Sequence, residues 1–64
     1  MAYLEEVRVR VAKNLLASTE NRITDIALNL GFSSSSYFSQ RFKILTGITP
    51  YDYRLMLRNN DLLP

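Results

Sequence analysis

The side chains best suited to chemistry gather in one short stretch, a run of four serines followed by Gln40, Arg41 and Lys43. Serine hydroxyls donate and accept hydrogen bonds, a glutamine amide can pair with both polar atoms of an adenine edge, and cations pair with phosphates. Acid–base or thiolate catalysis is a poor fit, because the chain holds no histidine and no cysteine. The stretch therefore indicates binding, and we expect no catalytic residue, no metal site and no cofactor.

Length and charge narrow the class of protein. With 64 residues, the chain forms one domain at most, and a chain this short has little stability in reserve. The formal net charge is +2. The excess lies in the second half, where residues 33–58 carry four cations against Asp52 alone. No apolar run is long enough to span a membrane, and the first residues lack the pattern of a signal peptide. We expect a cytoplasmic protein with no membrane partner and an affinity for polyanions.

The elements that position this stretch are predicted to be helices. Apolar residues recur at helical spacing over residues 3–17. The stripe expected to be buried comprises Leu4, Val7, Val11 and Leu15, widened on one side by Ala12 and Leu16. Residues 18–22 form a polar connector. A second helix follows, with Thr24 as the predicted N-cap and with Ile26, Ala27 and Leu30 facing the core. Gly31 is expected to end this helix by adopting a positive φ, after which Phe32 folds back onto the core.

The third helix is predicted from about residue 35 to 46, with Ser34 as its N-cap. On a helical wheel Phe38, Phe42 and Leu45 share the inner face. Tyr37, Arg41 and Ile44 lie along one flank, and the outer face is polar and small, made of Ser36, Ser39, Gln40 and Lys43. We expect Phe32, Phe38, Phe42 and Tyr53 to pack in the core rather than to stack on nucleobases.

The last helix is predicted over residues 49–58. Gly47 closes the third helix, and Thr49 and Pro50 are suited to the N-cap and first position of the next. Tyr53, Met56 and Leu57 give this helix an inner face, and residues 59–64 are expected to be a loose tail. The sequence thus predicts an all-α fold, a single small domain over residues 1–64 with about four helices.

Residues 23–46 fit a helix-turn-helix, in which two helices meet at a short turn containing glycine. The outer face of the second of these helices is small enough to approach base edges closely. Gln40 is suited to pairing with adenine, while Arg22, Arg41 and Lys43 are positioned to reach phosphates. The hydroxyl of Tyr37, on the flank of the same helix, is a further candidate for a phosphate contact. Free N–H groups at the start of the third helix also favour an anion.

The spaced residues resemble one family closely. Arg8-Val9, Ala12 and Leu15-Leu16 come first, then Ile23, Ile26-Ala27 and Gly31-Phe32, then Ser36-Tyr37-Phe38 and Phe42-Lys43, and finally Gly47, Thr49-Pro50 and Tyr53-Arg54. This pattern, which covers residue 3 to about residue 58, resembles the AraC/XylS family of bacterial transcription regulators. The resemblance implies a homeodomain-like fold in which residues 3–17 are the linker helix and residues 23–46 are the second of two helix-turn-helix units.

The resemblance also implies a partner and a set of contacts. The partner is double-stranded DNA, read sequence-specifically in the major groove by the third helix of a bacterial, cytoplasmic activator that lies on the nucleoid when bound. The residues implied to face bases are Ser35, Ser36, Ser39 and Gln40. Phosphate would be met by Lys43 and by the start of the last helix near Thr49. The first helix-turn-helix unit and an effector domain of such a regulator are missing from this sequence.

Two points stay open in the sequence. The same helices could form a protein-interaction module that contacts RNA polymerase or another regulator. Arg8 is expected to make a structural ion pair or to cap a neighbouring element, whereas Arg54 and Arg58 fit either a phosphate contact or a solvated helix end.

Overall fold

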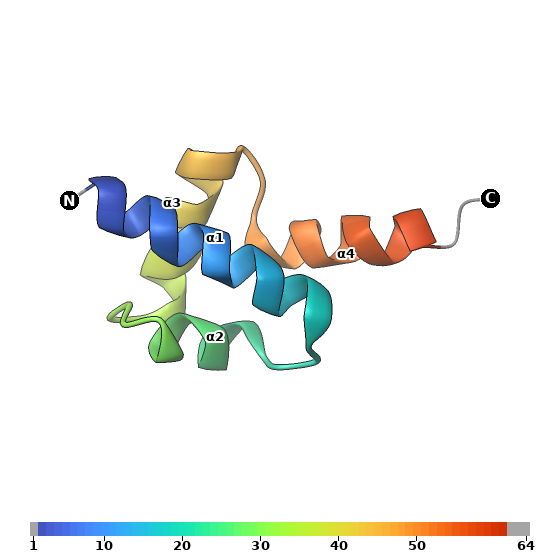
Figure 1. Ribbon diagram of the computed structural model, residues 1–64, viewed down its shortest axis with the longest axis horizontal. Coiled ribbons are helices and arrows are strands. Elements are labelled where there is room, and N and C mark those ends of the chain that lie inside the picture. Colours follow the sequence, from blue (N-terminus) through green and yellow to red (C-terminus); the bar gives the residue numbers. More distant parts are fainter. Residues whose placement is uncertain (1, 62–64) are drawn as a thin grey trace.

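The computed structural model describes residues 2–61, and the surroundings of the side chains of residues 4–59. It confirms an all-α fold, with four helices and no strand among these residues. The helices are α1 (Ala2–Ser18), α2 (Ile23–Asn29), α3 (Ser35–Thr46) and α4 (Pro50–Asp61). Helix α1 crosses the middle of the molecule and contacts each of the other three helices (Figure 1). The predicted tail residues 62–64 lie outside the described residues.

The apolar stripe of α1 that faces the core is shifted towards the edge of the predicted one, where Ala12 and Leu16 lie. The buried residues are Val9, Ala12 and Leu16, whereas Leu4 is 48% exposed and Val11 is 39% exposed. Helix α1 carries two overlapping apolar stripes, and the spacing of residues describes both equally well. The positions of α2, α3 and α4 decide between the stripes, because the packed helices cover only the face that holds the three buried residues.

Helix α2 packs Ile26 and Ala27 into the core, as predicted. The prediction that Thr24 caps this helix is wrong, because Arg22 occupies the N-cap position and the Ile26 N–H donates to the Arg22 carbonyl at 3.0 Å. Ile23 packs against the core and is already helical, which starts the helix early. Gly31 follows the helix at a φ of +91°. This conformation favours glycine and turns the chain towards α3.

A row of aromatic rings forms the centre of the core. Phe32 is 5.0 Å from Phe38, Phe38 is 5.7 Å from Phe42, and Phe42 is 5.7 Å from Tyr53, between ring centroids. The rings meet at tilted or edge-on angles, which suit the charge distribution of aromatic rings. This row confirms that these aromatic residues pack in the core. It ties the turn before α3, the inner face of α3 and the start of α4 together.

Helix α4 begins as predicted. The hydroxyl of Thr49 accepts from the Asp52 N–H at 3.1 Å, and Pro50 occupies the first helical position. The helix extends to Asp61, beyond the predicted end at residue 58. Asn and Asp cost less than about 0.7 kcal/mol each in a helix that is already nucleated, so they do not stop it.

The C-terminal part of α4 projects beyond the other helices (Figure 1). Tyr53 near its start packs against the core, whereas Met56 is 42% exposed. The inner face that Tyr53, Met56 and Leu57 were predicted to share is therefore covered only in part, because the packing of α4 is concentrated near its N-terminus.

Candidate nucleic-acid interface

Helix α3 is positioned from its two ends by local hydrogen bonds. The hydroxyl of Ser34 accepts from the Tyr37 N–H at 3.1 Å, which confirms Ser34 as the N-cap. At the other end Gly47 has a φ of +86°, and its N–H donates to the Lys43 carbonyl at 2.7 Å. The cap uses one of the free N–H groups of the first turn. The amides of Ser35 and Ser36 have no partner within the helix.

The two faces of α3 differ as the sequence predicts. Phe38 and Phe42 are fully buried and anchor the inner face. Three of the predicted contact residues on the outer face are exposed, namely Ser36, Gln40 and Lys43. Ser35 and Ser39 are half-buried at the edges of this face. The helix therefore presents hydroxyls, one amide and one cation on a surface without a carboxylate.

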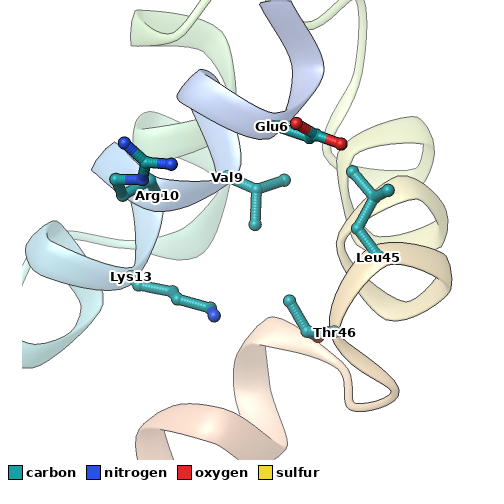
Figure 2. A pocket seen from close by; sticks show the side chains of 6 residues that line it. All are labelled: Glu6, Val9, Arg10, Lys13, Leu45 and Thr46. Atoms are coloured by element: carbon teal, nitrogen blue, oxygen red, sulfur yellow. The ribbon is translucent and has the colours of Figure 1, made fainter. Parts of the chain in front are cut away.

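Leu45 does not join Phe38 and Phe42 on the inner face. Its side chain is 38% exposed and lines an open hollow of about 300 Å³ between α1 and the end of α3 (Figure 2). The hollow is lined by Glu6, Val9, Arg10, Lys13, Leu45 and Thr46. None of these residues was predicted to contact DNA, so the hollow is separate from the predicted interface.

Arg41 lies on the flank of α3 and pairs with another helix. Its Nε donates to the Glu5 carboxylate of α1 at 2.6 Å, in a half-buried environment. This pairing with Glu5 was not predicted from the sequence. The sequence nevertheless indicates that Glu5 needs a cationic partner. Glu5 shares the helical spacing of the buried residues Val9, Ala12 and Leu16, and a carboxylate on a buried face is costly unless a cation pairs with it. The ion pair occupies Arg41 Nε and fixes α3 against α1.

The other four predicted phosphate contacts lie on α3 itself and at the starts of α2 and α4. Arg22 is exposed just before α2, and Thr49 is half-buried at the start of α4. Tyr37 is 44% exposed, with its ring 6.1 Å from that of Phe32. Lys43 is exposed on α3 itself. The three helix beginnings and the outer face of α3 thus carry the hydroxyls and cations that a phosphate backbone requires.

Two further arginines are structural. The guanidinium of Arg54 donates to the carbonyls of Leu16, Thr19 and Asn21 at 3.2, 3.3 and 2.7 Å, so it caps the end of α1. This cap was not predicted, since the sequence suggested a phosphate contact or a solvated helix end for Arg54. Arg58 pairs with Glu20 at 2.9 Å on the surface.

Arg8 lies 5.6 Å from the centroid of the Phe32 ring, where a cation–π contact holds the turn before α3. This is a structural role, although the contact is neither the ion pair nor the cap that we expected.

The residues that the structure describes include no candidate metal-binding group and no candidate membrane-spanning helix. No group of three or more His, Cys, Asp or Glu side chains gathers there in a way that could hold a metal ion. Of the helices in residues 2–61, none has the length and apolar character needed to cross a membrane.

Known proteins with similar sequences place the chain in one family. The model of a helix-turn-helix domain family matches residues 1–56. The chain is 45% identical over 62 residues to the HTH-type transcriptional activator RhaR of Yersinia pseudotuberculosis, covering 97% of the chain and 21% of that protein. It is 43% identical over 59 residues to the bifunctional transcriptional activator/DNA repair enzyme AdaA of Bacillus subtilis, covering 92% of the chain and 28% of that protein.

The chain thus spans between a fifth and a third of the length of these relatives. No solved structure shows a significant match to it.

Proposed function

The chain belongs to the AraC/XylS family of helix-turn-helix regulators, and we propose that it binds double-stranded DNA by inserting α3 into the major groove. DNA binding in a transcription regulator is the function that the family and both named activators support. The observation that carries the docking proposal is the contrast between the two faces of α3. Its inner face holds the fully buried Phe38 and Phe42, while its outer face is polar, cationic and free of carboxylates.

The proposed contacts divide into two groups. The residues proposed to face bases are Ser35, Ser36, Ser39 and Gln40, with Gln40 at the centre of the exposed face. The residues proposed to meet phosphates are Arg22, Tyr37, Lys43 and Thr49. Arg41 is a weaker candidate for phosphate than the sequence suggested, because its Nε is paired with Glu5. Serine hydroxyls discriminate weakly between bases, so Gln40 supplies most of the proposed specificity.

The wider assembly is also a proposal. We infer that the chain acts within a longer bacterial activator in the cytoplasm, since it matches 21% of the length of RhaR. The first helix-turn-helix unit, an effector domain and contact with RNA polymerase would belong to that longer protein. A function as a protein-interaction module without DNA binding is not favoured by the relatives.

We propose that the chain itself is not an enzyme. One relative is named as a DNA repair enzyme as well as an activator. Residues 1–64 nevertheless contain no histidine or cysteine, and the hydroxyl of Ser34 in the serine run is used to cap α3. The serine run therefore lacks the adjacent base that would activate a hydroxyl nucleophile.

The salt dependence of the affinity for duplex DNA tests whether the chain contacts phosphates as proposed. The affinity of the chain for a duplex selected from a random pool would be measured by fluorescence anisotropy at several salt concentrations. Roughly four to five phosphate contacts predict a slope of about −4 in a plot of log affinity against log salt concentration. A slope near zero would contradict phosphate binding by this chain.

Two variants separate base contacts from phosphate contacts. We expect Gln40→Ala to weaken binding to the selected duplex by about 1–3 kcal/mol and to change binding to unrelated duplexes little. The matched variant Lys43→Ala is expected to weaken binding to all duplexes about equally and to reduce the salt slope by about one. If both variants bound the selected duplex as tightly as the parent chain, α3 would not be the reading helix.

A further inference from the structure

We propose that Ile44 is a specificity-determining residue that reads a thymine methyl group in the major groove. This inference rests on the proposed function, because it requires that the outer face of α3 meets base edges. Ile44 is 66% exposed, the most exposed large apolar side chain in the described part of the chain. A single exposed apolar residue is common on protein surfaces, so its position on α3 must carry the argument.

That position is one helical turn beyond Gln40. Residues four apart lie on the same face of an α-helix, and Tyr37, Gln40 and Ile44 follow the i, i+3, i+7 spacing. Homeodomains read the major groove with residues at i, i+3, i+4 and i+7 of their recognition helix. In α3 the i+4 position is Arg41, which is paired with Glu5. Tyr37, at the i position, is 44% exposed and is proposed to meet phosphate, which leaves Gln40 and Ile44 to read bases in this row, with the exposed Lys43 next to them.

The chemistry of the two side chains is complementary to A·T pairs. Adenine presents a donor and an acceptor that a glutamine amide can bind together, and thymine presents a methyl group that apolar side chains contact. Four residues advance about 6 Å along a helix axis, whereas base pairs are about 3.4 Å apart. Ile44 therefore meets a thymine roughly two base pairs from the adenine read by Gln40.

No other apolar side chain on α3 suits this role. Phe38 and Phe42 are fully buried, and Leu45 turns towards the hollow beside α1 (Figure 2). Tyr37 is apolar over its ring, but that ring lies against Phe32 at the start of the helix. Ile44 is thus the apolar residue of α3 left exposed on the flank next to Gln40.

Replacing thymine by deoxyuridine removes only the methyl group and leaves base pairing intact. The test uses the duplex selected from a random pool, with each thymine replaced in turn by deoxyuridine, and measures the affinity of the chain by fluorescence anisotropy. For the parent chain we expect one or two replacements to weaken binding about fourfold per methyl. In Ile44→Ala the penalty at these positions is expected to disappear, while Ile44→Val retains most of it.

Leu4→Ala is the matched control. Leu4 is also an exposed apolar residue, but it lies on α1, so this variant is expected to keep the parental pattern of deoxyuridine penalties. Circular dichroism of Ile44→Ala is expected to match the parent, because the side chain removed is exposed.

The outcomes separate this inference from the proposed function. Salt-dependent duplex binding without any deoxyuridine penalty, or with the same penalty in Ile44→Ala, would overturn the role of Ile44 and leave DNA binding by α3 intact. If Ile44 contacts another protein and not a base, the same result is expected. Failure to bind any duplex would overturn both proposals.

Discussion

At the scale of single residues, two arginines of α4 bind the end of α1 and the connector after it, away from the proposed interface. Arg54 is half-buried and donates to three carbonyls at and beyond the end of α1, so it joins α4 to α1 across the sequence. Arg58, one turn later, makes an exposed ion pair with Glu20. Hydrogen bonds from a charged donor to partly buried carbonyls are stronger than an ion pair that water screens.

We therefore expect Arg54→Ala to destabilise the domain by about 1.5–3 kcal/mol. The matched variant Arg58→Ala is expected to change the free energy of unfolding by less than about 1 kcal/mol. Urea unfolding followed by circular dichroism measures both. Equal stabilities for the two variants would mean that the cap on α1 contributes nothing.

At the scale of elements, the turn between α2 and α3 sets the angle at which α3 leaves α2. Gly31 turns the chain at a φ of +91°, and Phe32 then enters the core. Arg8 of α1 covers this turn, since a Cβ built on Gly31 would lie 3.3 Å from Arg8 Nη2. Gly47 has a similar φ of +86°, but no atom lies within 4 Å of its would-be Cβ.

This difference predicts unequal costs for two alanine substitutions. Both Gly31→Ala and Gly47→Ala force alanine into a positive φ, which costs about 1–2 kcal/mol. Gly31→Ala is expected to cost more, because the methyl group also crowds the guanidinium of Arg8, which packs against Phe32. Thermal unfolding measures the difference between the two melting temperatures.

The Arg8→Ala background supplies the control for this prediction. In that background the two glycine variants are expected to lose nearly equal stability, because the crowding at Gly31 is gone. If the gap persisted without Arg8, the contact between Arg8 and the turn would not be its cause.

At the scale of the whole molecule, one core cluster with a row of aromatic rings at its centre joins all four helices. The molecule measures 40 × 21 × 17 Å, and its core depends on Phe32, Phe38, Phe42 and a few aliphatic residues (Figure 1). A single core in so small a domain rarely supplies more than about 3–5 kcal/mol of stability. The folded state, and with it the geometry of the proposed interface, therefore depends on very few side chains.

Phe42→Ala is expected to unfold the domain, because truncating a buried phenylalanine costs about 3–5 kcal/mol. Leu45→Ala, three residues later and 38% exposed, is the control and is expected to cost much less. Circular dichroism and thermal melting compare the two variants. A cooperative melt of Phe42→Ala near the parental temperature would contradict a core centred on this ring.

The sequence by itself determined the four helices, both ends of α3, the start of α4 and the contrast between the two faces of α3. The physical reason is that these features depend on short-range effects. Ser34 and Thr49 cap the helices that follow them, and Gly31 and Gly47 supply the positive φ that ends a helix. The period of the α-helix then separates the buried Phe38 and Phe42 from the exposed Gln40 and Lys43.

Only the tertiary structure decided how the helices meet. It selected Val9, Ala12 and Leu16 over the neighbouring stripe of α1, and it paired Arg41 with Glu5. It also placed Arg54 at the end of α1. These outcomes depend on the relative positions of residues more than 30 apart in the chain. Helical spacing allows several such pairings, and the packing of the four helices around one core selects one of them.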